Sequence, residues 1–399
     1  MRDKLGPGTT LSYCTNVHPA GTLSATRSQL AQHALQIKKI VSPGEPLGVG
    51  LWIPFIGEEP TTFRVLAALA KAILRIPDTE TDRLRRFLKR ANLEALTCNA
   101  FPFHDFHDEV VKHRVYEPDW SDRLRIIQTF AAAGWMEEFE THASTISIST
   151  LPLGWRSEQD QSNLIHAAAE NLRRMARMLD YSEQPERPIV TLDLEPEPGC
   201  ILDTCDDVIA FFDEHLTEDI HRKHIGVCHD ICHAAVMFED QREVLRRYAE
   251  AGIRVNKVQI SSALDVDVRT IGVETAIEHL RPFAEPRYLH QTGFMTGDRF
   301  ELIEDLPDAI ERLEAGETPD RLRVHFHVPV YLDRIGPLGT TNNQIAEAVA
   351  AAREYHDTKH FEVETYAWGV LPDELKRDTL AEGIADELKW VLDTCGHIT

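Results

Sequence analysis

Polar and reactive side chains recur in this sequence at the places where short β-prone runs end. Any one of them has an ordinary structural explanation, such as a helix cap or a satisfied core histidine. Because such residues recur at the ends of several β-prone runs, we expect them to form a functional site. The residues at these ends are Asn16, His18, Asn99, His104, His107, Glu195, Glu197, Asp230, His233, Gln259 and Glu364.

Three acids in this set, Glu195, Asp230 and Glu364, define the chemistry that we expect. Carboxylates that converge from neighbouring strands repel one another unless they are protonated or neutralised by a cation. Carboxylate oxygens with one nitrogen or amide donor suit a hard divalent cation such as Mg²⁺ or Mn²⁺. On opposite sides of a hydroxy-carbonyl substrate, the same carboxylates could move protons while the cation polarises its oxygens.

A structural zinc site is a competing interpretation of the run HRKHIGVCHDICH, which contains Cys228, His229, Cys232 and His233. The two cysteines lack the two-residue gap of a zinc knuckle, and no second cysteine pair lies nearby. We therefore disfavour this interpretation.

The runs that precede the reactive side chains have the character of strands, and segments of helical periodicity separate them. Ala168, Leu172 and Met175 keep the i, i+4, i+7 spacing of a helix that covers a sheet. In REVLRRYAEAGIRVNKVQIS, a helix is followed by Gly252 as a left-handed cap and then at once by a strand. The predicted strands begin at Leu11, Leu47, Ala95, Thr145, Ile189, Ile225, Val255, Arg323 and Phe361.

The strand spacing predicts a (β/α)₈ TIM barrel that forms a single domain over residues 1–399. Successive strands begin roughly 30 to 50 residues apart through the first seven, which is the length of a βα unit with its loops. An open doubly wound sheet is the alternative, but no glycine-rich phosphate loop follows the first strand. The long gap before the last strand predicts an insertion at about residues 262–358. In such a barrel, chemistry takes place at the carboxyl ends of the strands.

The composition argues against two classes of partner. The sequence has 65 Asp and Glu against 42 Lys and Arg, a net charge of −23, which opposes binding to nucleic acid or to an anionic membrane surface. The first residues show no secretory signal, and the most apolar helix candidate, VLAALAKAIL, is too short to span a membrane. An odd count of seven scattered cysteines does not indicate a disulfide framework. We expect a reduced, cytoplasmic protein without nucleic-acid partners or direct membrane insertion.

Three motifs resemble the metal-binding strands of the xylose isomerase-like TIM barrels, namely LDLEPEPG, GVCHDICH and FEVETY. That superfamily includes sugar isomerases, ketose 3-epimerases and endonuclease-four-type enzymes. Within it, the chain resembles the metabolite-traffic protein EboE family through segments that span nearly its whole length. These segments are LSYCTNVHPAGT, NAFPFHDFHDEVVKHRVYEPDW, SISTLPLGW, RVHFHVPVY and ETYAWGVLP.

The resemblance implies that Glu195, Asp230 and Glu364 bind a divalent metal, which would be manganese, magnesium, cobalt or zinc. In epimerase-type members the two glutamates also form the acid/base pair, so Glu195 and Glu364 are the implied catalytic residues. The histidine of the Asp-x-x-His motif, His233, would contact the substrate or steady the metal ligands.

The sequence departs from the superfamily on the seventh strand, where Gln259 stands in place of the usual histidine ligand. We expect His290 or His325 from the insertion to supply the missing ligand, or the site to bind metal weakly. His325 and His327 are two residues apart, so on a strand both would face one side, as metal ligands or as part of a polar barrel interior.

Six residues are expected to bind the substrate, namely Asn16, His18, Asn99, His104, His233 and Arg156. Arg156 could contact a phosphate group on a small substrate, and so could Arg334, which is not in this set.

Two functional hypotheses follow, and a third is disfavoured. The first is a metal-dependent sugar or sugar-phosphate isomerase or epimerase that acts on a small hydroxylated metabolite, with other proteins of a metabolite-traffic pathway as candidate partners. The second is a catalytically weak or inactive barrel that carries such a metabolite, motivated by Gln259 and by aromatic loops. Metal-dependent phosphodiester hydrolysis is disfavoured because it usually needs several clustered metals with many histidine ligands, and because DNA binding opposes the net charge. The aromatic loop residues are Phe101, Phe103, Phe106, Trp120 and Trp155.

Overall fold

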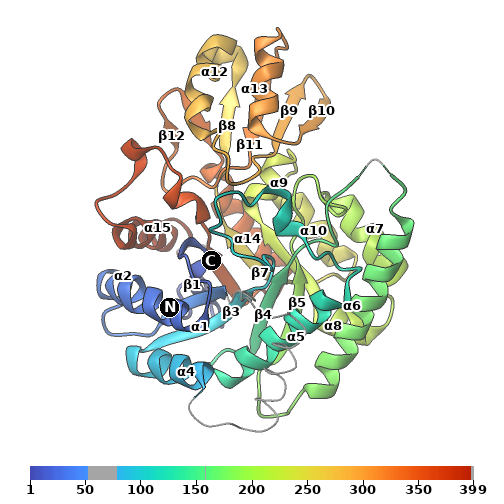
Figure 1. Ribbon diagram of the computed structural model, residues 1–399, viewed down its shortest axis with the longest axis vertical. Coiled ribbons are helices and arrows are strands. Elements are labelled where there is room, and N and C mark those ends of the chain that lie inside the picture. Colours follow the sequence, from blue (N-terminus) through green and yellow to red (C-terminus); the bar gives the residue numbers. More distant parts are fainter. Residues whose placement is uncertain (53–78, 158, 397–399) are drawn as a thin grey trace.

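The computed structural model describes residues 1–52, 79–157 and 159–396. Eight parallel strands close into a barrel in the order β1-β14-β7-β6-β5-β4-β3-β2 (Figure 1), which confirms the predicted (β/α)₈ fold. Each barrel strand overlaps a run that the sequence pattern predicts as a strand. The strands are β1 (Thr10–Cys14), β2 (Leu47–Trp52), β3 (Leu93–Asn99), β4 (Thr145–Thr150), β5 (Ile189–Leu194), β6 (Ile225–Asp230), β7 (Val255–Ile260) and β14 (His360–Val363).

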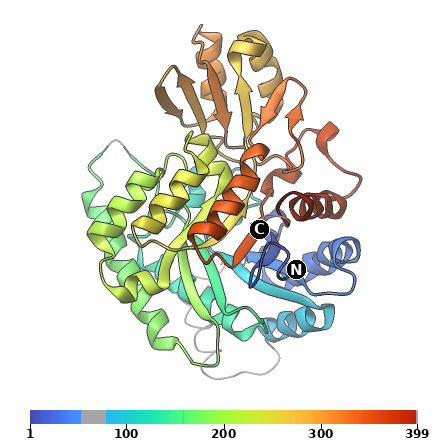
Figure 2. The same ribbon diagram turned by 180° about the vertical axis from the view of Figure 1, so that it is seen from behind.

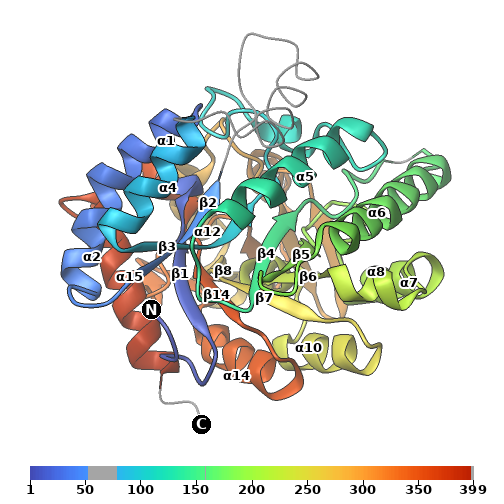
Figure 3. The same ribbon diagram turned by 90° about the horizontal axis from the view of Figure 1, so that it is seen from below.

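Helices between the strands form an outer ring around the barrel (Figure 3). In the longest of them, Ala168, Leu172 and Met175 are fully buried, so the predicted apolar face covers the sheet. Gly252 has a positive φ of 67°, as expected of the cap before β7. The apolar candidate at residues 65–74 lies outside the described residues. The ring helices are α1 (Leu23–Gln29), α2 (Leu35–Val41), α4 (Glu80–Ala91), α5 (Arg123–Glu138), α6 (Ser162–Ser182), α7 (Cys205–His215), α8 (Asp219–His224), α9 (Ile231–Val236), α10 (Gln241–Glu250), α14 (Ile345–Tyr355) and α15 (Leu380–Cys395).

The long segment between β7 and β14 contains a second sheet, which stands over one end of the barrel (Figure 1). Its six strands follow the order β10-β9-β11-β8-β13-β12. The sheet ends at Thr340, and the last part of the segment forms α14, which packs against α10 in the outer ring (Figure 2). Its elements are β8 (Leu264–Asp267), α11 (Val268–Ile271), α12 (Val273–Leu280), β9 (Thr292–Thr296), β10 (Arg299–Ile303), α13 (Leu306–Glu314), β11 (Arg321–Val324), β12 (Arg334–Ile335) and β13 (Leu338–Thr340).

The predicted strand RVHFHVPV is a strand only at its first two residues, which complete β11. After Val324 the chain leaves the inserted sheet, although backbone hydrogen bonds from His325 to Gln291 (2.8 Å) and from Val328 to Ser262 (3.0 Å) still fix its path. The alternating pattern was therefore wrong about the secondary structure here. The segment instead carries His325 and His327 to the mouth of the barrel, where both line a pocket.

A fully buried ion pair lies in the barrel interior below the strand ends. Lys257 Nζ of β7 is 2.9 Å from Glu362 Oε1 of β14, and both side chains are inaccessible to solvent. Ser12 and Thr97 donate hydrogen bonds to the other oxygen of Glu362. Burial alone would lower the pKa of Lys257, but the Glu362 carboxylate raises that pKa well above its usual value. A Cβ atom at Gly50 would collide with this carboxylate, so the glycine makes room for the pair.

All seven cysteines are buried, and none of them forms a disulfide. Three of them, Cys14, Cys98 and Cys228, lie in barrel strands, where the sequence indicated small core residues. Within the described ranges, no helix combines the length and the apolar character needed to cross a bilayer.

Replacing Lys257 by Met is expected to destabilise the protein by about 3–5 kcal/mol, because Glu362 would remain buried without a partner. The measurement is the free energy of unfolding from urea denaturation followed by circular dichroism. The double variant Lys257→Met with Glu362→Gln should recover part of the loss, since it removes the unpaired charge. Unchanged stability in the single variant would contradict an energetic role for the pair.

Candidate functional site

Three buried carboxylates meet at the carboxyl ends of the barrel strands. Glu195 follows β5, Asp230 ends β6 and Glu364 follows β14, and one oxygen of each lies within 4.8 Å of the other two. The three residues are only 3%, 2% and 4% exposed. The structure thus brings together the three acids that the sequence singled out.

Two of these carboxylates each keep one oxygen without a hydrogen-bond partner among the described residues. Asp230 caps the amino end of α9, so its Oδ1 accepts hydrogen bonds from the His233 backbone (3.0 Å) and from Ser261 Oγ (2.7 Å). Its Oδ2 and the Oε2 of Glu195 accept none. Buried oxygens without donors are costly, and a bound cation would satisfy them.

Two asparagines orient the third carboxylate. The side-chain amides of Asn16 and Asn99 donate to Glu364 Oε1 over 2.6 Å and 3.3 Å. Both asparagines, which the sequence placed among the substrate-binding residues, also line the pocket above the carboxylates. They therefore fix the direction of Glu364 and still reach the space that a substrate would occupy.

Gln259 occupies the position on β7 between the strands that carry the acids. It is fully buried and lies in register with Asp230 on β6 and with Glu362 on β14. Neither its amide oxygen nor its amide nitrogen has a hydrogen-bond partner in the described part of the chain. Its oxygen is therefore free to act as a neutral donor beside the carboxylates.

Two imidazole rings face Asp230 from outside the barrel strands. His327 donates from Nδ1 to the Glu364 carbonyl oxygen (2.8 Å), and His233 donates from Nδ1 to the Pro196 carbonyl oxygen (2.8 Å). Their Nε2 atoms lie 3.9 Å and 4.0 Å from Asp230 Oδ2. Backbone hydrogen bonds of this kind hold the tautomer and the direction of metal-binding histidines.

The two insertion histidines that the sequence proposed as ligands behave differently. His325 lines the pocket, and its Nε2 lies 3.2 Å from Nε2 of His233. His290 uses both ring nitrogens elsewhere, because Nδ1 donates to the His325 carbonyl oxygen (2.9 Å) and Nε2 faces Glu285 Oε1 at 2.9 Å. His327, rather than His290, therefore comes closest to the three carboxylates.

Other residues expected to bind the substrate do not line this pocket. His18 packs against Tyr13 and stacks on His33 with ring centroids 4.7 Å apart. His104 is exposed beside a separate small cavity. Arg156 is also exposed and bonds to Asp203 Oδ1 (2.7 Å), which ties the loop after β4 to the loop after β5.

Arg334, the other candidate for a phosphate contact, is exposed on β12 and donates to the Pro337 carbonyl oxygen. Like the three residues above, it does not line the pocket.

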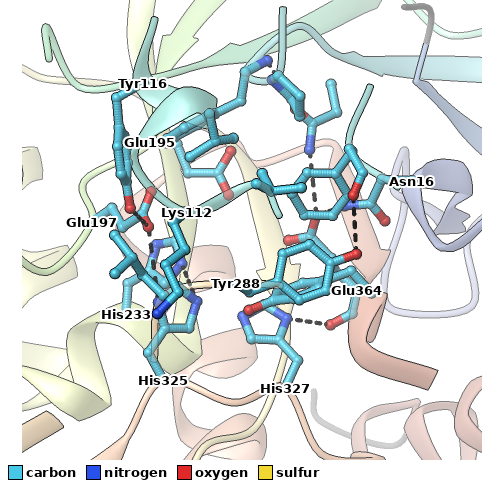
Figure 4. A pocket seen from close by; sticks show the side chains of 18 residues that line it. Asn16, Lys112, Tyr116, Glu195, Glu197, His233, Tyr288, His325, His327 and Glu364 are labelled. Atoms are coloured by element: carbon cyan, nitrogen blue, oxygen red, sulfur yellow. Dashed lines mark hydrogen bonds and ion pairs between the residues drawn. The ribbon is translucent and has the colours of Figure 1, made fainter. Parts of the chain in front are cut away.

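The pocket above the carboxylates has a polar floor and an aromatic wall (Figure 4). The rings of Phe106, Tyr288 and Tyr366 form the wall, with centroids 4.9 to 5.4 Å apart. The lining residues are Asn16, Asn99, Phe101, Pro102, Phe106, Val111, Lys112, Val115, Tyr116, Glu195, Glu197, His233, Tyr288, Leu289, His325, His327, Glu364 and Tyr366.

Several lining residues were not among the site residues assigned from the sequence. Glu197 and His327 each carried a signal, since each lies two residues from an assigned site residue, Glu195 or His325. Lys112 and Tyr116 come from a loop before α5 with no periodicity to mark them. Only the folded chain places this loop against the inserted segment.

The electrostatics of the site reflect crowded negative charge. Burial and the neighbouring Glu364 raise the pKa of Glu195 well above its usual value, and burial and Asp230 raise the pKa of Glu364 to about 7. Burial alone would raise the pKa of Asp230, but His233 and His327 hold that pKa below its usual value. Burial lowers the pKa of His327 to about 4, so its Nε2 is available as a neutral donor.

The donor set fits a divalent cation. Three carboxylates, a neutral amide and imidazole nitrogen match the ligands that magnesium, manganese, cobalt or zinc accept. The unpartnered oxygens of Glu195 and Asp230 are the observation that carries this fit.

The competing zinc interpretation at residues 221–233 is not supported, because in the described part of the chain no group of possible metal ligands contains two of Cys228, His229, Cys232 and His233. His229 instead bonds to the Gln241 side chain over 2.7 Å, and in the described part of the chain it belongs to none of the groups that could hold a metal.

No family model matches the sequence, and no curated protein matches it. Among solved structures, a xylose isomerase-like TIM barrel protein from Mycobacterium smegmatis in complex with magnesium is similar, with a TM-score of 0.54, 11% identity and 97% of each chain covered. The IOLI protein with a bound zinc atom (TM-score 0.49, 12% identity, 98% of this chain and 99% of that one) is also similar. So is an L-ribulose 3-epimerase (TM-score 0.46, 11% identity, 98% and 92%). The similarity to the Mycobacterium smegmatis protein shows a barrel of the xylose isomerase-like type, whereas the narrower resemblance to the EboE family stays a prediction.

The stability of the metal-free protein is expected to fall as the pH rises from about 4.5 to about 7. Over this window the unfolded chain releases the Glu364 proton while the folded protein, in which its pKa is about 7, retains it. The contribution of Glu364 reaches at most about 3 kcal/mol. Urea denaturation at several pH values, with chelator present, should give a steeper decline for the wild type than for Glu364→Gln. Equal slopes in the two proteins would contradict the raised pKa.

Proposed function

We propose that the protein is a divalent-metal-dependent isomerase or epimerase that acts on a small hydroxylated metabolite such as a sugar or sugar phosphate. The observation that carries this proposal is the convergence of Glu195, Asp230 and Glu364 within 4.8 Å of one another, beside the pocket that Glu195 and Glu364 line. Within the described residues, Glu195 and Asp230 each keep one oxygen without a hydrogen-bond partner. The structurally similar protein from Mycobacterium smegmatis was crystallised with magnesium, which is consistent with a metal at the strand ends.

Four side chains would hold the metal. Glu195, Asp230 and Glu364 offer oxygens, and His327 offers Nε2 from the inserted segment in place of the histidine missing from β7. Gln259 would add its amide oxygen as a weaker donor. A divalent cation bound there polarises the carbonyl and hydroxyl oxygens of a substrate and so makes a neighbouring C–H bond more acidic.

Glu195 and Glu364 are the proposed acid and base. Isomerisation and epimerisation both remove a proton from a carbon next to a carbonyl group and return one at another atom or on another face. Burial and the neighbouring carboxylates raise the pKa of both glutamates, that of Glu364 to about 7, and a raised pKa favours a carboxyl group that can hold and release a proton. They extend from β5 and β14, strands separated in the barrel by β6 and β7, so they can reach a substrate from different sides.

The rest of the pocket would bind and orient the substrate. Asn16, Asn99 and His233 offer polar groups near the carboxylates, and the wall formed by Phe106, Tyr288 and Tyr366 would cover a ring or carbon chain and exclude water. The sequence resemblance is the sole support for a metabolite-traffic pathway as the source of substrate and of protein partners.

The alternative of a carrier barrel without turnover rests on Gln259 at the position of the usual histidine and on the aromatic loops. The nearness of His327 to Asp230 weakens this alternative, because an imidazole nitrogen is available after all. Measurements of metal content and of proton exchange separate the two proposals.

Replacing Glu195 or Glu364 by Gln is expected to lower the metal content of the purified protein, because each substitution removes an anionic ligand. Mass spectrometry of the metals in each protein measures the effect. Glu94→Gln is the matched control, since Glu94 is also buried but pairs with Arg2 away from the pocket. Unchanged metal content in both site variants would refute the ligand set.

An active isomerase is expected to exchange a substrate C–H proton with solvent. Candidate ketoses and their phosphates are incubated with the metal-loaded protein in D₂O, and NMR follows deuterium incorporation next to the carbonyl group. Glu195→Gln and Glu364→Gln should each slow the exchange by about 10²–10⁴-fold. A carrier would show no exchange above the uncatalysed background with any candidate that binds.

A further inference from the structure

A buried glutamate of the last helix joins three segments that lie far apart in the sequence. Glu387 of α15 is 1% exposed. Its carboxylate accepts hydrogen bonds from Thr365 Oγ1 (2.5 Å), from the backbone N–H of Val330 (3.2 Å) and from the indole N–H of Trp368 (3.0 Å). None of these four residues lines the pocket. The group therefore lies outside the site described above, and the proposed chemistry does not use it.

Two of the donors adjoin proposed metal ligands. Thr365 follows Glu364 directly, and Val330 lies three residues after His327 in the inserted segment. The two segments already meet at the pocket, because His327 Nδ1 donates to the Glu364 carbonyl oxygen over 2.8 Å (Figure 4). Glu387 links the same two segments a second time, outside the pocket, so their relative position is fixed at two points.

The third donor belongs to the turn that supplies part of the aromatic wall. Trp368 and Tyr366 share the short helix Tyr366–Gly369. The indole ring of Trp368 packs on α15 at Gly383, where a Cβ atom would collide with the ring. Glycine inside a helix costs about 1 kcal/mol relative to alanine, so α15 gives up stability where this ring must fit. Gly383 and Glu387 are four residues apart, and one face of α15 therefore holds both the ring and its N–H group.

Packing alone does not account for a glutamate at this position. All three donors are neutral groups, and a carboxyl group buried without a cationic partner is costly compared with an apolar side chain. A carboxylate can, however, accept from several donors at once. Its Oε1 accepts from Thr365 and Val330, and its Oε2 accepts from Trp368. Glu387 thus adds a fixed geometry between three segments, which an apolar residue would not provide.

We propose that Glu387 is a positioning residue of the metal site, which sets the segments of Glu364 and His327 at the distance that one cation requires. Through Trp368 it also holds the turn that carries Tyr366 against α15. This inference rests on the proposed function, because Glu364 and His327 are ligands only if a metal binds there. Without Glu387 the ligands remain in the chain, but their relative position is no longer fixed, and the bound metal loses affinity.

The test measures the Kd for Co²⁺, and the visible spectrum of the bound ion, in chelator-stripped full-length protein. Glu387→Ala is expected to raise the Kd by about 10- to 100-fold, as loss of a group that orients metal ligands does, and to alter the cobalt spectrum. Glu387→Gln retains an amide oxygen for Thr365 and Val330 but turns an amide N–H group toward Trp368. Its Kd is expected to lie between those of the wild type and the alanine variant.

Glu94→Ala is the matched control, because Glu94 is also buried and accepts a backbone hydrogen bond, from His142 (2.7 Å), but does not line the pocket. It should keep the Kd and the cobalt spectrum of the wild type. Circular dichroism confirms folding at the temperature of each titration, and if Glu387→Ala fails to fold, Glu387→Gln decides the result.

The outcomes separate this inference from the proposed function. A higher Kd in both Glu364→Gln and the folded Glu387 variants supports the ligand and the residue that positions it. A higher Kd in Glu364→Gln alone, with Glu387→Ala lowering only the free energy of unfolding, overturns the positioning role and leaves the metal site standing. A Kd unchanged by Glu364→Gln refutes the ligand set itself, and the positioning role is overturned with it.

Discussion

Concentrated negative charge at the mouth of the barrel is the constraint on which the site depends. Glu195, Asp230 and Glu364 are buried with oxygens within 4.8 Å of one another. At that separation each ionised pair costs about 3 kcal/mol, so three pairs together approach the whole stability of a typical domain. Lys257 lies nearby but is already paired with Glu362. The folded protein must therefore take up protons or cations here. The raised pKa values of Glu195 and Glu364, and the unpartnered oxygens of Glu195 and Asp230, both result from this concentration of charge.

The inserted segment places imidazole groups beside this negative charge. It stands over one end of the barrel (Figure 1), and its residues His325, His327 and Tyr288 line the pocket. The ring of His327 is anchored to the backbone of Glu364, so the barrel and the insertion position each other's side chains. The metal chemistry proposed for this barrel thus belongs to neither part alone.

Local pattern predicted much of the barrel, because inward and outward residues of each strand and helix follow fixed periods. Glu195, Asp230 and Glu364 could be singled out because parallel strands end at the same edge of a barrel. The same reasoning did not place His18, His104 and Arg156, which follow barrel strands but do not line the pocket and have other neighbours. The segment around His325 alternates like a strand but leaves the sheet after Val324. Which loops meet is decided by contacts between distant residues, and a local pattern contains no record of them.

The two ends of the insertion pair with each other, since β8 lies beside β13 with Leu264 opposite Thr340. This pairing matters for how the barrel closes. Without it, β14 would have to find β7 across a flexible loop of about 100 residues, and closing such a loop costs conformational entropy that grows with the logarithm of its length. Once β8 and β13 have joined, the effective loop is about a quarter as long, which lowers the cost of closure by about 1 kcal/mol. An insertion that ties its own ends together leaves the host chain with the topology of an ordinary βα unit.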